Sequence, residues 1–131
     1  LYRGMSQSEF NDICMSFIPQ INNDLRFDTM QHIRWHQKLG HEIVIVSASI
    51  GNWIRPWAET HGISTVLATE IETGTDDKLT GKFITPNCHG EEKVKRIIAA
   101  IPTVSTRETW AYGDSAGDKA MLSMATHSYK I

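Results

Sequence analysis

Apolar residues recur along the first third of the chain at two spacings, one helical and one typical of a buried strand. The segments 6–18 and 27–40 have the helical spacing, so each is predicted to be a helix with one apolar face. The segment 41–49 (HEIVIVSAS) is a nearly continuous β-branched run, which is typical of a strand buried on both faces. The apolar face of the second helix is predicted to consist of Met30, Ile33, Trp35 and Leu39.

The same alternation continues to the end of the chain. The pattern predicts helices over 49–62, 89–101 and 115–125, and strands over 64–72, 79–84, 108–114 and 127–131. Helices that alternate with strands are typical of the α/β class, in which a parallel sheet carries helices on both faces. The turn residues GTDD (74–77) predict an excursion within 66–84 in the form of a β-hairpin.

Composition excludes several classes of protein. A chain of 131 residues is long enough for one domain, and its net charge of −2 offers no basic surface for nucleic acid. The longest apolar run, 43–50, is far shorter than the ~20 residues of a membrane span. Cys14 and Cys88 form neither a disulfide framework nor a C-x-x-C site, which favours a reducing, cytoplasmic setting.

Polar residues stand where ligands gather in parallel sheets, at the carboxyl ends of strands and the starts of helices. They are Ser47-Ala48-Ser49 after the first buried strand, Lys93 in the first turns of a helix, and Asp114 after the strand 108–113. Taken singly, each has a structural interpretation: the serine and the aspartate as helix caps, and the lysine as part of a solvated face.

Asp114 and Asp118 are four residues apart, a spacing that places both carboxylates on one face of a helix. Like charges at this spacing repel, whereas a shared hard cation such as Mg²⁺ would favour them. The small residues 115–117 between them would let a ligand approach the backbone closely.

The ordered set of motifs resembles the haloacid dehalogenase superfamily and, within it, the phosphoserine-phosphatase-like branch. The matching stretches are VIVSASIGNW, PNCHGEEKVKRI and YGDSAGDKAML. The resemblance implies a three-layer, Rossmann-like fold and a Mg²⁺-dependent phosphatase acting on a small phosphorylated substrate. It implies that Ser47 and the Ala48 N–H bind the phosphoryl oxygens, that Lys93 neutralises charge, that Asp114 ligates Mg²⁺, and that Asp118 supports the metal or holds Lys93.

The first motif of that family, D-x-D-x-T, has no match in this chain. The stretches NNDLRFD (22–28) and TDDK (75–78) lack both the preceding strand and the following threonine. By family analogy the chain is therefore expected to lack the central strand and its nucleophile, and to be inactive alone. Residues 1–26 would be the tail of a helical cap and 27–131 a partial core, completed by an N-terminal segment of the same protein. Strands 42–47 and 108–113 are then expected not to pair with each other.

Other interpretations stay open. The alternative function is that of a non-catalytic, truncated domain that serves as a binding or interaction module. The family's phosphoserine phosphatases usually carry Asn at position 117 and Ser-Gly where this chain has Ser47-Ala48, so the substrate is not fixed as phosphoserine.

His32 and His36 lie four apart on a predicted helix, and a polar helix face is favoured over a metal pair because no H-E-x-x-H acid accompanies them. Asn52 and Arg55 are candidates for contacting the leaving group.

Overall fold

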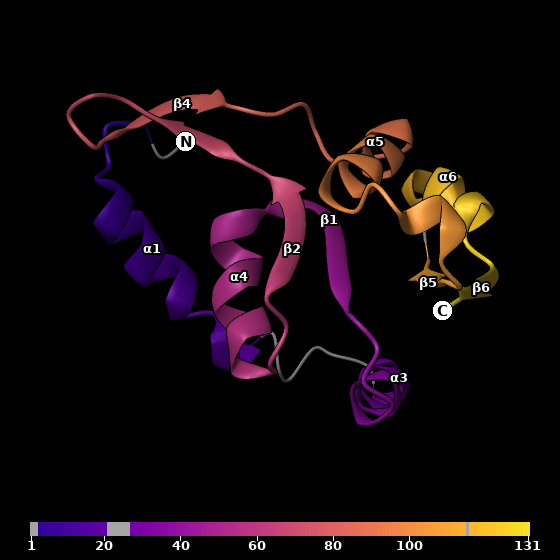
Figure 1. The fold of residues 1–131 in the computed structure, drawn as a ribbon. Helices are drawn as coiled ribbons and strands as arrows, with labels where there is room; N and C mark the ends of the chain where they lie inside the picture. Colours follow the sequence, from indigo (N-terminus) through magenta and orange to yellow (C-terminus); the bar gives the residue numbers. More distant parts are fainter. Residues whose placement is uncertain (1–2, 21–26, 115) are drawn as a thin grey trace.

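The computed structural model describes residues 3–20, 27–114 and 116–131. The first helix begins after Ser6, whose Oγ accepts a hydrogen bond of 3.1 Å from the Glu9 N–H and so satisfies one of the exposed donors of the first turn. The helices, shown with the chain coloured along its length in Figure 1, are α1 (Gln7–Met15), α3 (Phe27–Lys38), α4 (Gly51–Thr60), α5 (Glu91–Ala100) and α6 (Lys119–Met124), with 3-10 turns η1 (Val104–Thr106) and η2 (Ala116–Asp118).

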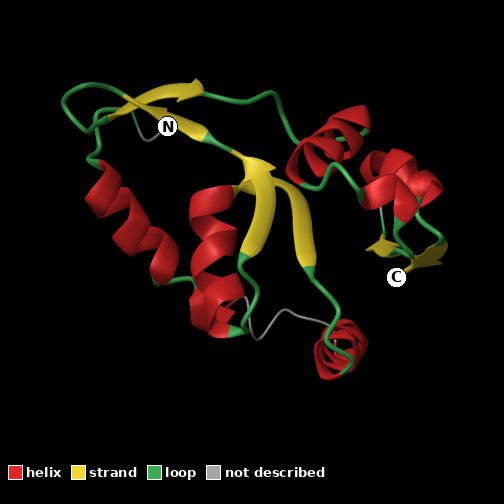
Figure 2. Cartoon of the chain, viewed as in Figure 1, coloured by secondary structure: helices red, strands yellow, loops and turns green. Residues whose placement is uncertain are grey.

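The strands form separate two-stranded sheets among the described residues (Figure 2). Strands β1 and β2 pair in parallel, as do β5 and β6, whereas β3 and β4 form an antiparallel hairpin. The strands are β1 (Val44–Ile50), β2 (Thr65–Thr69), β3 (Ile71–Thr73), β4 (Leu79–Phe83), β5 (Trp110–Gly113) and β6 (His127–Lys130).

Helices cover both faces of the β1–β2 pair, which gives the three layers of an α/β, Rossmann-like fold. Successive residues of a strand point to opposite faces. Ile45 accordingly packs against the cluster around Trp57 of α4, and Val46 against the cluster around Ile97 of α5. A third cluster around Phe10 joins α1 to the hairpin. The hydrophobic core is thus divided among the strand pairs.

Several boundaries differ from those that the sequence predicts. Ser47 to Ser49 do not follow the first strand but belong to β1, whose register against β2 is irregular between Val46 and Ile50. Helix α4 therefore begins only at Gly51. Trp35 of α3 and Leu39, which follows the helix, are exposed rather than part of an apolar face, while His36 is buried. The side chain at position 36 points toward β5 and meets Tyr112, a long-range contact that helical periodicity does not reveal.

The predicted helix 115–125 is also divided. The chain forms the 3-10 turn η2 and then the short helix α6, so Asp114 and Asp118 do not share a helical face. Asp114 is exposed and Asp118 is buried. The predicted boundary at residue 26, between a cap tail and a core, lies outside the described residues, as does Ser115.

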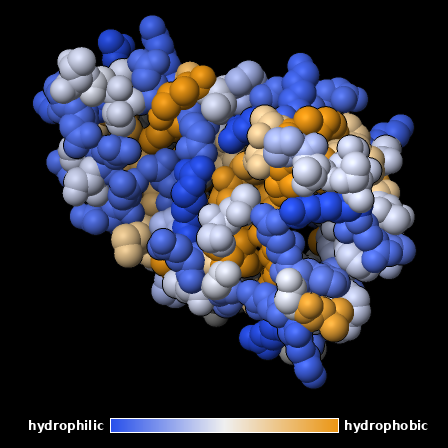
Figure 3. Space-filling model, viewed as in Figure 1, coloured by the Kyte–Doolittle hydropathy of each residue, from blue (hydrophilic) through white to orange (hydrophobic). Residues whose placement is uncertain are grey.

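A groove separates β1 from β5. Within the described residues β1 pairs only with β2, and β5 only with β6, so the prediction that strands 42–47 and 108–113 do not pair is confirmed. The groove holds a cavity of about 480 Å³ between Val44–Val46 and Trp110–Tyr112, with Ile97 and Met121 among its apolar lining residues. Hydrophobic residues are visible in the middle of this face, between hydrophilic margins (Figure 3). We call this feature the β1–β5 groove.

Candidate active site

Lys93 is the buried centre of the site. It lies in the first turn of α5, and its side chain is only 8% exposed. The ammonium group donates hydrogen bonds to the Val46 carbonyl of β1 (3.1 Å) and to Asp118 Oδ1 (2.6 Å). A buried ammonium is stable only when it is paired and hydrogen-bonded. The interpretation of Lys93 as part of a solvated face is therefore wrong.

Asp118 organises the turn that follows β5. Its Oδ1 accepts from Lys93, and its Oδ2 accepts the Asp114 N–H at 3.1 Å. Gly113 makes this approach feasible, since a Cβ at that position would lie 2.6 Å from the Asp118 Cβ. Both oxygens of Asp118 are thus occupied within the chain, and the carboxylate holds Lys93 and the backbone of Asp114 together.

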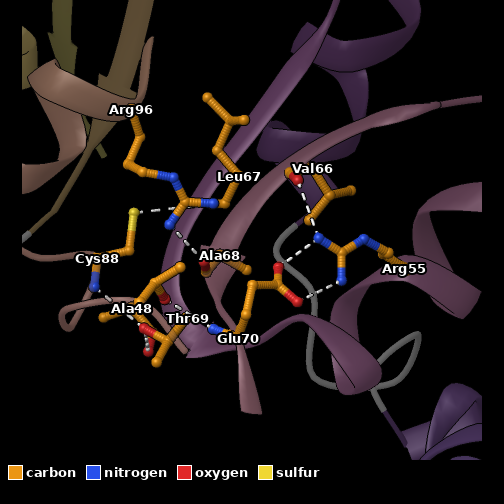
Figure 4. Close-up of polar contacts among 10 residues, drawn as sticks. Ala48, Arg55, Val66, Leu67, Ala68, Thr69, Glu70, Cys88 and Arg96 are labelled. Carbon is orange, nitrogen blue, oxygen red and sulfur yellow. Dashed lines mark hydrogen bonds and ion pairs between the residues drawn. The ribbon is translucent and has the colours of Figure 1, made fainter. Parts of the chain in front are cut away.

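Ser47 and Ala48 lie at the irregular end of β1. The Ser47 Oγ accepts the Ser49 N–H at 3.0 Å, which holds the chain in a local turn. The Ala48 carbonyl accepts a hydrogen bond of 2.9 Å from the Thr69 hydroxyl, which in turn accepts the Cys88 N–H at 3.0 Å (Figure 4). Thr69 therefore ties the ends of β1 and β2 to the loop that leads into α5.

Sequence reasoning did not single out Thr69. Its hydroxyl is a component of the site only because the end of β1, the end of β2 and the loop before α5 converge on it. The one signal of this role in the sequence was that Thr69 is the last residue of a β-branched strand. Arg96 has a similar role, since its guanidinium donates to the Ala68 carbonyl at 2.7 Å and braces the same strand end (Figure 4).

Arg55 and Asn52 are engaged elsewhere. The Arg55 guanidinium binds both carboxylate oxygens of Glu70 and reaches the Val66 carbonyl (Figure 4). The hydrogen bonds to Glu70 raise the Arg55 pKa above its ordinary value. Asn52 donates to Asn11 Oδ1 of α1. Both side chains hold α4 to its neighbours rather than lying open to a leaving group.

Cys88 and His89 lie just before α5. His89 is exposed, and its ring lies against Gly117, where a Cβ would approach its Cδ2 to 2.4 Å. Cys88 is buried, and desolvation raises the pKa of its thiol.

The donor set supports a magnesium site only in part. Asp114 is an exposed carboxylate at the carboxyl end of β5, which suits a hard cation. The described residues contain no group of three or more His, Cys, Asp or Glu side chains placed to share a metal. Mg²⁺ is usually held by one or two carboxylates together with waters and substrate phosphate. Asp114 therefore fits as one protein ligand in a coordination shell of this kind.

The motif order and this geometry agree with a comparison against protein families. The model for haloacid dehalogenase-like hydrolases matches residues 1–123. The chain belongs to this family. It is 33% identical over 118 residues to protein CicA of Caulobacter vibrioides, a match that covers 88% of this chain and 51% of that protein. It is 27% identical over 104 residues to a histidinol-phosphatase of Neisseria meningitidis, covering 76% of this chain and 47% of that one.

Several solved structures share the fold of this chain. A Bordetella pertussis protein of unknown function superposes with a TM-score of 0.83 at 23% identity, over 94% of this chain and 57% of that one. A probable phosphoserine phosphatase of Vibrio cholerae superposes with a TM-score of 0.72 at 15% identity, over 97% of this chain and 38% of that one. The chain spans about half the length of its sequence relatives, at 51% and 47%. The matching family model is that of hydrolases, and one of these relatives is named a phosphatase.

Proposed function

We propose that this chain forms the charge-stabilising half of a Mg²⁺-dependent phosphomonoesterase. The observation that carries the proposal is the buried Lys93 ammonium, held between the Val46 carbonyl of β1 and Asp118, which follows β5. Phosphoryl transfer depends mainly on positioning and on stabilising negative charge, and a preorganised buried cation supplies both.

The other site residues take roles that follow from their chemistry. The Ser47 hydroxyl and the Ala48 N–H bind phosphoryl oxygens at the end of β1. Lys93 offers its remaining ammonium hydrogen to the phosphoryl group, while Asp118 keeps it in place. Asp114 provides a carboxylate ligand for Mg²⁺, which when bound would neutralise phosphate charge. The compartment proposed for this reaction is the cytoplasm, because the described cysteines are unpaired thiols.

We assign the nucleophile to a segment of the same protein outside residues 1–131. In the family's chemistry an aspartate oxygen attacks phosphorus, the P–O bond to the alcohol breaks, and the second aspartate of the same motif gives the leaving alcohol its proton. Water then attacks the aspartyl-phosphate, which releases phosphate and restores the carboxylate.

The β1–β5 groove supports this assignment. A strand seated between β1 and β5 would pair with both edges and would end beside Lys93 at the carboxyl end of the sheet. The lining of the groove is largely apolar, as the faces of a central strand require, and the chain spans only about half of its relatives. The occupant is therefore proposed to be a parallel strand that carries the catalytic aspartate.

The experiment compares the chain with the full-length protein. Purified residues 1–131 and the full-length protein are each incubated with Mg²⁺ and p-nitrophenyl phosphate. We expect hydrolysis only by the full-length protein, lost on chelation of Mg²⁺ and on Asp114→Asn. Hydrolysis by the chain alone, abolished by Asp114→Asn, would place the nucleophile within residues 1–131 and overturn the assignment.

A non-catalytic binding module is the second candidate. The open groove favours it, because an apolar cavity of about 480 Å³ is within the range of small-molecule sites, ~300–1,000 Å³. If the full-length protein lacks Mg²⁺-dependent activity toward a panel of phosphomonoesters and binds neither Mg²⁺ nor phosphate, this candidate replaces the first.

A further inference from the structure

Strand β1 is irregular at the place where phosphate binding is proposed. From the paired positions Val46 and Leu67 to the paired positions Ile50 and Thr69, β1 advances four residues while β2 advances two. A bulge of this kind takes backbone groups of the longer strand out of the ladder, and those groups then need other partners. The backbone of residues 47–49 accordingly takes hydrogen bonds from side chains.

Both polar groups of the Ala48–Ser49 peptide are held by side chains. The Ala48 carbonyl accepts a hydrogen bond of 2.9 Å from the Thr69 hydroxyl (Figure 4). The Ser49 N–H donates to Ser47 Oγ at 3.0 Å. The Thr69 hydroxyl has a second acceptor in Asn87 Oδ1, but the longer distance of 3.3 Å favours the bond to Ala48. The plane of this peptide is thus fixed from both sides, which limits the rotation of the Ala48 N–H that precedes it.

The Thr69 hydroxyl also reaches the segment that leads to Lys93. Its oxygen accepts the Cys88 N–H at 3.0 Å, in the loop before α5. Lys93, in the first turn of that helix, donates to the Val46 carbonyl at 3.1 Å. Two carbonyls of β1 are therefore anchored, that of Val46 by Lys93 and that of Ala48 by Thr69. The Ala48 N–H lies between them in the chain.

Thr69 acts through the backbone that it holds. Its side chain belongs to a residue that is only 5% exposed, whereas Ala48 and Ser49 are exposed. A ligand bound to the exposed turn would therefore contact the turn and not Thr69. One hydroxyl both donates and accepts a hydrogen bond here, a combination that a valine of nearly the same shape does not offer.

We propose that Thr69 is a positioning residue that sets the Ala48 N–H relative to the Lys93 ammonium, so that both can bind one phosphoryl group. The inference rests on the proposed function and adds to it a residue that contacts no substrate atom. Because Thr69 acts on the groups that bind phosphoryl oxygens, loss of its hydroxyl weakens all phosphoryl ligands alike, whichever alcohol the ester carries. The role does not depend on the occupant of the β1–β5 groove, since β2 pairs with the other edge of β1.

The test measures the binding of inorganic phosphate to the full-length protein by titration calorimetry in the presence of Mg²⁺. Thr69→Val removes the hydroxyl and keeps the shape, which takes this partner from the Ala48 carbonyl and the Cys88 N–H. We expect the affinity for phosphate to fall about tenfold or more, an effect of the size produced by buried polar groups that lose their partner. Thr69→Ser keeps the hydroxyl and is expected to have an affinity close to that of the parent protein.

Kinetics separate positioning from a general loss of stability. In Thr69→Val, the KM values of p-nitrophenyl phosphate and of glycerol phosphate are expected to rise by the same factor, with a smaller change in kcat. Thr65→Val makes the same chemical change at the amino end of β2 and is expected to leave both constants unchanged. A merely structural role would lower the urea midpoint of Thr69→Val without changing the phosphate affinity of the folded protein.

The outcomes distinguish the two levels of the argument. If Thr69→Val binds phosphate as the parent does, or if Thr69→Ser loses as much affinity as Thr69→Val, the positioning role is overturned and the phosphatase assignment stands. If the parent binds no phosphate in the presence of Mg²⁺, the proposed function fails and the positioning role fails with it.

A second variant applies if Thr69→Val does not fold. Thr69→Cys introduces a thiol, which is close to a hydroxyl in size but a weak donor and acceptor. It is expected to bind phosphate more weakly than Thr69→Ser, and equal binding by these two variants overturns the proposal.

Discussion

The Lys93 ammonium lies 2.6 Å from Asp118 Oδ1, and both side chains are about nine-tenths buried, with exposed fractions of 8% and 10%. The same ammonium reaches the Val46 carbonyl, and the same carboxylate accepts the Asp114 N–H. One ion pair therefore joins α5, β1 and the turn after β5. Its position makes it a structural link among these three segments.

Replacing Lys93 by methionine is expected to destabilise the protein by about 3–5 kcal/mol, because Asp118 remains as a buried, uncompensated charge. Lys95→Met on the exposed side of the same helix is the control and is expected to change stability by less than about 0.5 kcal/mol. Urea unfolding measures both. Adding Asp118→Asn to Lys93→Met should recover part of the loss, and strictly additive costs would show that the two side chains are not coupled.

Asp114→Asn is expected to lower Mg²⁺-dependent hydrolysis by the full-length protein at least ~100-fold, since a metal ligand contributes several kcal/mol of charge stabilisation. The exposed position of Asp114 predicts that the unfolding midpoint hardly changes. Asp12→Asn on the exposed face of α1 is the matched control. Unchanged turnover in Asp114→Asn would remove this residue from the metal site.

Gly113→Ala is expected to destabilise the turn after β5 by about 1–3 kcal/mol, because its Cβ would lie 2.6 Å from the Asp118 Cβ. The clash displaces the carboxylate from Lys93, so activity should fall together with stability. Gly74→Ala is the control, since its Cβ would come to 3.0 Å only from the movable Asp76 Oδ1, with the Lys78 carbonyl and the Thr80 Cγ2 at an ordinary contact distance of 3.8 Å. Equal thermal midpoints for the two variants would contradict the tight packing at position 113.

Cys14 and Cys88 are expected to react slowly with iodoacetamide in the folded protein. Both thiols are buried, and desolvation raises the pKa of each, so little reactive thiolate forms at neutral pH. Denaturant should make both react at the rate of a free thiol. Mass spectrometry of the alkylated protein counts the modified sites, and rapid labelling of Cys88 under native conditions would show that the start of α5 opens readily.

The isolated chain is expected to unfold at a lower denaturant concentration than the full-length protein. Empty strand edges along the β1–β5 groove leave backbone groups without sheet partners, and buried groups of this kind cost about 1–3 kcal/mol each. Hydrogen exchange locates the effect: amides of β1 and β5 should be protected by the additional segment, whereas those of the β3–β4 hairpin should not change. Identical exchange in both forms would mean that the segment binds elsewhere.

The sequence alone was sufficient for the order of helices and strands and for the α/β class. Helical and β-branched periodicities are local properties, and in this chain they agree with the packing that they predict, as for Ile45 and Val46 on opposite faces of β1. The motif order also predicts which residues form the site. The structure brings Lys93 and Asp118 into contact, and the catalytic roles of these residues stay a prediction.

Only the tertiary structure decided how those residues are used. Asp118 was expected on a helical face with Asp114, yet the 3-10 turn directs it to Lys93, a residue twenty-five positions earlier in the sequence. His36 was expected on a polar face, yet it is buried between His41 and Tyr112. The physical reason is the same in both cases. The cost of burying a charge or an imidazole is met by partners distant in sequence, and periodicity along one helix contains no information about which distant element supplies them.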